Sequence, residues 1–146
     1  MPFRFRLDAV LRFRESVELT EEALLHRIVR EIAEANLELQ QVNLKQAQLR
    51  EQREHDLARK LPAVHLLEIA EREQKLSQAA DRLRARLQQL DSQRVKQMAI
   101  YQSAHQDHQV LSELREQQLR SYGVDQRRQE QKMLDDMFLA RWKDGN

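Results

Sequence analysis

Residues 25–53 read LHRIVREIAEANLELQQVNLKQAQLREQR, and alternating steps of three and four residues through them meet an apolar side chain at seven of nine positions. These positions form a first row of Leu25, Ile28, Ile32, Ala35, Leu39, Val42, Gln46, Leu49 and Arg53. An apolar repeat of about 3.5 residues is typical of a helix in a left-handed coiled coil. The stretch therefore predicts a long helix that buries one narrow face.

The same spacing recurs between residues 69 and 111. It gives a second row of Ile69, Glu73, Leu76, Ala80, Leu83, Leu87, Leu90, Arg94, Gln97, Tyr101, Ala104, His108 and Leu111. Its apolar run is interrupted mainly at Arg94, Gln97 and His108. We interpret Arg94 and Gln97 as a polar register marker or a local loosening rather than as a binding site, and we expect Arg94 to turn outward or to find a carboxylate.

Pro62 is the single internal proline, and proline disfavours helical geometry at the residue before it. We therefore predict a connection near 60–66, a first helix over about 7–59 and a second over about 67–141. Helices of this length need a partner, and a short connection makes them antiparallel neighbours. The predicted fold is all-α: one antiparallel two-helix coiled-coil hairpin rod over residues 1–146.

Folding the chain near residue 63 pairs residues whose numbers add up to about 126, to within about one helical turn. The expected pairs are Leu39 with Leu87, Val42 with Leu83, Leu49 with Leu76, Leu57 with Ile69, and Arg53 with Glu73. Phe3 then falls opposite Gly123, so the second helix outlasts the first, and we expect a kink or a fraying point at Gly123. The overhang carries an uncovered apolar cluster of Met133, Leu134, Met137, Phe138, Leu139 and Trp142, which is typical of an interaction surface.

Composition excludes several classes of protein. The chain has two Gly and two Pro, where average usage gives roughly ten and seven, and its 34% charged and 5% aromatic residues leave little for a thick core. Lys plus Arg number 25 and Asp plus Glu 24, with the signs interspersed, which argues against nucleic-acid binding. There is no Cys, and neither a membrane-spanning run nor a signal peptide is evident. We expect a soluble, cytoplasmic protein.

Motifs for catalysis and cofactor binding are absent from the sequence, so we expect neither an enzyme nor a cofactor. His105 and His108 share a helical face and could hold a metal ion with Glu18 or Glu22. The ordinary alternative is a partly buried, hydrogen-bonded His108 in the second row.

Two further surfaces have alternative interpretations. Leu37 and Leu44 form a thin second apolar stripe, either scattered surface leucines or a partner groove. The N-terminus combines Phe3, Phe5 and Phe13 with Arg4, Arg6, Arg12 and Arg14. This composition suits docking to an acidic or apolar protein surface better than binding to a membrane.

Two stretches resemble a known family. The opening FRFRLDAVLRFRE (residues 3–15), with Glu21-Glu22-Ala23, and the closing EQKMLDDM (residues 130–137), with Arg141, are similar to the termini of FliJ-family proteins of the bacterial flagellar type III export apparatus. The middle of the chain resembles the family in length, charge and periodicity only. The alternatives are an injectisome counterpart and a generic coiled-coil scaffold.

The resemblance implies a stalk-like protein that binds the hexameric export ATPase and links it to the membrane export gate and to export chaperones. It also implies a position at the flagellar base, associated with the inner membrane only through partners. The implied ATPase-binding residues are Phe3, Phe5, Leu7, Leu11, Arg12, Arg127, Arg128, Lys132, Met133, Met137, Phe138 and Trp142. The implied gate-binding residues are Gln40, Leu44, Leu76, Ala79 and Leu83.

Overall fold

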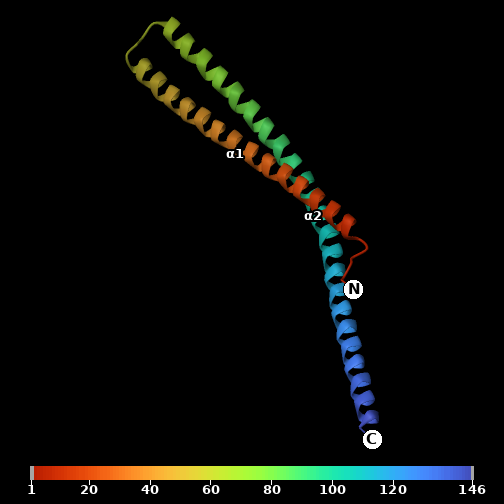
Figure 1. Cartoon of the computed structure of the whole chain (residues 1–146). Coiled ribbons are helices and arrows are strands. Elements are labelled where there is room, and N and C mark those ends of the chain that lie inside the picture. The colour runs from red at the N-terminus through yellow and green to blue at the C-terminus, as the bar shows by residue number, and fades with distance from the viewer. Residues whose placement is uncertain (1, 146) are drawn as a thin grey trace. The chain divides into compact units, whose positions relative to one another are not determined.

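The structure, a computed structural model, describes residues 2–145 and contains two helices joined by a short turn. Helix α1 spans Asp8–Ala58 (51 residues) and α2 spans Ala63–Asp144 (82 residues), as Figure 1 shows. No strand occurs among the described residues. The predicted all-α helical hairpin is confirmed.

Contacts divide the chain into two compact units. We call Glu21–Tyr101 the turn unit and Met1–Thr20 with Gln102–Asn146 the terminal unit. Each helix contributes to both units, and the units are described separately below. In the part of the chain that the structure describes, no helix is long and apolar enough to cross a membrane.

In the turn unit, α1 and α2 lie side by side and pack along the two predicted rows (Figure 1). Every member of the first row except Arg53 is buried or half-buried, and so is every member of the second row from Ile69 to Tyr101. Leu25, Ala35 and Leu49 from α1 are buried, as are Ile69, Ala80 and Leu90 from α2. The 3.5-residue period therefore identified the buried faces correctly.

Helix α1 is followed by a residue in the left-handed backbone conformation. Lys60 has φ 55°. The backbone N–H of Lys60 donates to the carbonyl oxygen of Leu57 (3.2 Å), and the backbone N–H of Leu61 donates to the carbonyl oxygen of Asp56 (3.4 Å). These two bonds are those of a Schellman motif, in which glycine is the usual left-handed residue. Helix α2 begins at Ala63, four residues before the predicted start. Proline is well suited to a helix start, and the carbonyl of Pro62 accepts the bond from the amide of His65 (3.0 Å).

Polar pairing near the turn follows the predicted register with one correction. Arg53 Nη1 lies 3.1 Å from Glu73 Oε2, as expected. Leu57 was expected to cover Ile69, but it is 53% exposed, and Asp56 is buried instead. A step of three from Arg53 leads to Asp56, so the row itself continues there. The buried carboxylate accepts a hydrogen bond from His65 Nε2 (2.9 Å), which compensates for its desolvation.

In the terminal unit, the segment before α1 folds back onto α2. The ring centroids of Phe3 and Tyr122 are 5.6 Å apart, one residue from the predicted partner Gly123, and Phe5 is buried. Helix α2 continues through Gly123 without a break, and Arg127 Nε donates to the Gly123 carbonyl (3.3 Å). The helix therefore does not fray at Gly123, and the kink stays a prediction.

Candidate partner-binding surfaces

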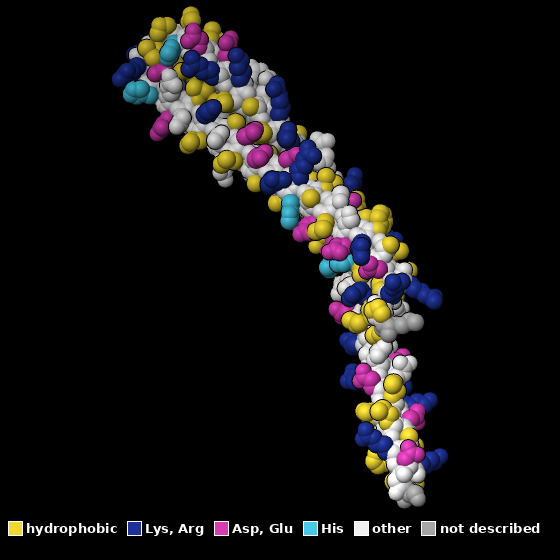
Figure 2. Space-filling model, in the orientation of Figure 1, with side chains coloured by type: hydrophobic (Ala, Val, Ile, Leu, Met, Phe, Trp, Pro, Cys, Tyr) yellow, Lys and Arg dark blue, Asp and Glu magenta, His cyan; other side chains and the backbone are white. Residues whose placement is uncertain are grey.

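Residues 124–145, which we call the C-terminal segment, carry a group of uncovered apolar side chains. Glu, Gln, Lys, Leu and Met are strong helix formers and keep this part of α2 helical up to Asp144. Six of its large apolar side chains are between 53% and 69% exposed, namely Met133, Leu134, Met137, Phe138, Leu139 and Trp142. Figure 2 shows hydrophobic side chains on the surface of this segment among charged ones. Every residue from 127 to 145 is exposed, as the sequence predicted.

The cations expected beside this cluster lie on the same segment. Arg127, Arg128 and Lys132 are exposed, in the two turns that precede Met133. An exposed apolar surface bordered by cations is suited to a partner that offers a hydrophobic sleeve with acidic groups near its mouth.

A second surface of the terminal unit is a hollow at the start of the chain. It is lined by Phe3, Arg4, Phe5, Asp8, Arg12 and Arg115. Arg12 Nη2 lies 2.7 Å from Asp8 Oδ2, and the guanidinium carbon of Arg115 lies 5.9 Å from the centre of the Phe3 ring. Sequence reasoning placed Phe3, Phe5 and Arg12 on one surface but missed Arg115.

The other N-terminal residues implied for ATPase binding differ in how exposed they are. Leu7 is exposed and Leu11 is half-buried, whereas Phe5 is only 8% exposed. The buried Phe5 ring is therefore part of the packing of the terminal unit in this conformation. Phe3 is half-buried, against Tyr122.

The residues implied for the export gate differ in exposure. Gln40 and Leu44 are exposed on α1, whereas Leu76, Ala79 and Leu83 are half-buried on α2. Leu76 shares a groove with Leu49 and with three cations and two glutamines, which are Lys45, Arg72, Lys75, Gln48 and Gln52. Leu44 is not among the residues that line this groove. Sequence reasoning missed these cations, although each lies next to a row position.

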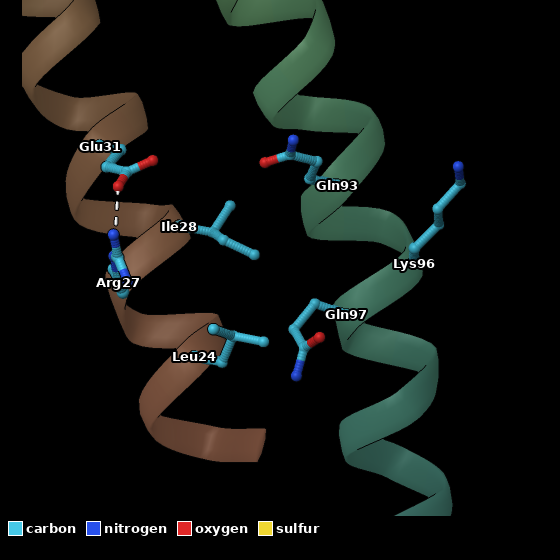
Figure 3. Close-up of a pocket in the computed structure, with 7 residues that line it drawn as sticks. All are labelled: Leu24, Arg27, Ile28, Glu31, Gln93, Lys96 and Gln97. Carbon is cyan, nitrogen blue, oxygen red and sulfur yellow. Dashed lines mark hydrogen bonds and ion pairs between the residues drawn. The ribbon is translucent and has the colours of Figure 1, made fainter. Parts of the chain in front are cut away.

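Another groove of the turn unit lies beside the polar interruption of the second row. In Figure 3 the Ile28 and Gln97 side chains point toward one another across it, and Lys96 points away. Gln97 is buried, and its Nε2 donates to the backbone carbonyl of Glu21 (3.0 Å) and to Oε2 of the same residue (2.5 Å). Gln97 thus acts as a polar tie between the helices, in agreement with its interpretation as a register marker.

Arg94 finds a carboxylate, as the sequence analysis predicted. Its side chain is 38% exposed, and its Nε and Nη2 lie 3.1 and 2.9 Å from Asp91 Oδ1 on the same helix. The charge is therefore not buried alone, which would be costly.

The histidines considered as metal ligands meet a carboxylate in the terminal unit. His105 Nδ1 lies 2.7 Å from Glu18 Oε1, and His108 Nδ1 lies 2.5 Å from Glu18 Oε2. Within residues 2–145 no group of three side chains is arranged to hold a metal ion. His108 is half-buried and hydrogen-bonded, so the ordinary interpretation of this histidine is confirmed.

Comparison with known families gives a match over nearly the whole chain. The family described as Flagellar FliJ protein matches residues 3–146. Comparison with curated proteins and with solved structures gave no match.

Proposed function

The chain belongs to the FliJ family of flagellar export-related proteins, and from this premise we propose that it binds the ring of the flagellar export ATPase through its terminal unit. In this proposal it is a non-catalytic component that promotes the assembly and activity of the ring. The C-terminal segment supplies the main contact, and the hollow at Phe3 and Arg12 supplies a second one.

The exposure of the C-terminal segment carries the proposal. Met133, Met137 and Phe138 are more than half exposed, although apolar side chains of this size normally pack against their own chain. A helix with apolar residues at such spacing can insert into a hydrophobic sleeve. Methionine is flexible, so it suits a sleeve whose subunits change shape around the helix.

Family membership also supports three finer proposals. We propose that the chain links the ATPase to the membrane export gate, that it handles export chaperones, and that it is cytoplasmic and reaches the inner membrane only through these partners. The surface for the gate would include Gln40 and Leu44 on α1 and Leu76, Ala79 and Leu83 on α2. An injectisome counterpart is the alternative assignment, and the match to a flagellar family favours the flagellar one.

The proposal is tested by truncating the chain after Tyr122 and measuring the ATPase rate of a purified flagellar export ATPase. The truncated chain should retain its helical hairpin but lose the stimulation. The double variant Met137→Ala with Phe138→Ala should weaken binding by about tenfold or more, since a few buried apolar anchors dominate most interfaces.

The matched control is the double variant Leu37→Ala with Leu44→Ala. It removes two leucines of α1 that are similarly exposed, at 58% and 60%, and it should leave stimulation unchanged. Full stimulation by the truncated chain would contradict the proposal.

A further inference from the structure

The C-terminal segment contains a further coiled-coil pattern. Alternating steps of three and four residues through it give a third row, which consists of Arg127, Glu130, Leu134, Met137, Arg141 and Asp144. Helix α2 is unbroken over these residues, so the row follows one face of the helix for about 27 Å. All six residues are exposed. The third row is therefore a coiled-coil face that no described part of the chain covers.

The charges of the third row are complementary when the row is read from its two ends. The outermost residues, Arg127 and Asp144, are of opposite sign, and so are the next two, Glu130 and Arg141. When two copies of a helix pair antiparallel, each of these residues lies opposite its counterpart in the other copy, and two-fold symmetry forms each pair twice. A parallel arrangement would instead place every charge opposite its own copy, which is repulsive.

Apolar side chains occupy the centre of the third row. Leu134 and Met137 are its two middle members and are 60% and 55% exposed. Met133 and Phe138 lie beside them, one on each side of the row, and are 64% and 69% exposed. The positions that directly flank the row are uncharged, namely Gln126, Gln131, Met133, Phe138 and Ala140. An antiparallel partner helix would therefore cover the apolar centre without burying an unpaired charge.

We propose that two copies of this chain pair antiparallel through the third row and form a two-fold symmetric dimer. A second copy is the occupant that the row favours because the row is complementary to itself, a property that a surface for a different protein does not need. The other charges of the segment lie on the outer face of such a pair, and the net charge of +1 adds little repulsion between the copies.

The dimer should be weak because its interface is short and its ion pairs stay close to solvent. We expect a dissociation constant on the order of 100 µM. Below about 10 µM the chain is then mostly monomeric, with its C-terminal segment uncovered. The dimer would cover Met137 and Phe138, so it would exclude the proposed ATPase contact, but its formation does not depend on that contact.

Sedimentation equilibrium of the full chain, without the ATPase, between about 5 and 500 µM tests the dimer. The average mass should rise from 17.5 kDa toward twice that value. Glu130→Arg places cations opposite each other and Arg141→Glu places anions opposite each other, so each should weaken the dimer about tenfold or more. Both positions are exposed on the helix, and circular dichroism checks that each variant keeps its helical content.

A charge swap makes the test specific for the antiparallel register. The double variant Glu130→Arg with Arg141→Glu again has opposite charges at the paired positions, so its dissociation constant should return to within about threefold of that of the original chain. An equimolar mixture of the two single variants should form a mixed dimer, since one variant has only cations at these positions and the other has only anions.

The matched control is Asp136→Arg, which changes the net charge as Glu130→Arg does but lies on the outer face and should leave the dimer unchanged. An average mass that stays at 17.5 kDa at the highest concentration would overturn the dimer and leave the ATPase proposal standing. The antiparallel pairing would be overturned if the single variants weakened the dimer no more than the control, or if neither the double variant nor the mixture restored it.

Discussion

The turn unit and the C-terminal segment are built from similar sequence but differ in what covers them. In the turn unit, Leu25 and Leu90 are 7% and 5% exposed because the opposite helix lies against them. In the C-terminal segment, Phe138 is 69% exposed, and no described part of the chain covers it. Apolar spacing therefore predicts which face of a helix is suited to apolar packing. The presence or absence of an opposing helix decides whether that face becomes part of a core or stays exposed.

The largest expected effect contrasts one apolar residue from each region. Ile69 is 2% exposed, so Ile69→Ala should lower the free energy of unfolding by about 3 kcal/mol, through lost transfer energy and a residual cavity. Met137 is 55% exposed, and Met137→Ala should change it by less than about 0.5 kcal/mol. Urea denaturation of both variants measures the contrast. Comparable losses would mean that the C-terminal segment is packed in solution.

The next effect concerns the polar tie in the turn unit. Gln97→Ala removes the donor that satisfies the Glu21 carboxylate and leaves a small void, so it should destabilise the chain by about 1–2 kcal/mol. Gln93→Ala is the matched control, since Gln93 is exposed on the rim of the same groove. Thermal unfolding distinguishes the two variants, and a Gln97→Ala variant as stable as the control would show that the tie contributes little.

The smallest effect is a gain in stability at the turn. Lys60→Gly should stabilise the hairpin by about 0.5–1 kcal/mol, because φ 55° is strained for lysine and natural for glycine. Arg59→Gly, one residue earlier, removes no such strain and should be destabilising. Denaturant midpoints of the two variants check the sign, and a loss of stability in Lys60→Gly would contradict the left-handed end of α1.

Much of the fold could be predicted from the sequence, because the apolar positions of the first row pair with those of the second row when the chain is folded near residue 63. The rows predicted the buried faces, the ion pair of Arg53 with Glu73, and the arrival of Phe3 beside Gly123, where it meets Tyr122. Each of these features depends on the 3.5-residue period, which is visible directly in the sequence. The weaker packing expected around Arg94 stays a prediction.

Other features depend on details that periodicity does not encode. Helix α2 begins at Ala63 because Pro62 precedes it as a favourable start, whereas the prediction treated proline as a break. Asp56 rather than Leu57 is buried because His65 provides a hydrogen bond across the turn. The burial of Phe5 depends on how the segment before α1 folds back, which no helical period describes.

Partner surfaces are less predictable than the fold. The exposure of Met133 and Phe138 was predicted correctly from the pairing of the two rows, but exposure alone does not identify a partner. The cations Lys45, Arg72 and Lys75 were missed because their common groove exists only when both helices are in place.

Hydrogen exchange along the full chain tests the central claim most directly. Amides of residues 28–49 and 76–90 should be strongly protected, because opening them requires separating the paired helices. Amides of residues 127–144 should exchange with little protection, since a helix without a partner is only marginally stable in water. Equal protection in both regions of the isolated protein would contradict the claim that the C-terminal segment is uncovered and free to bind a partner.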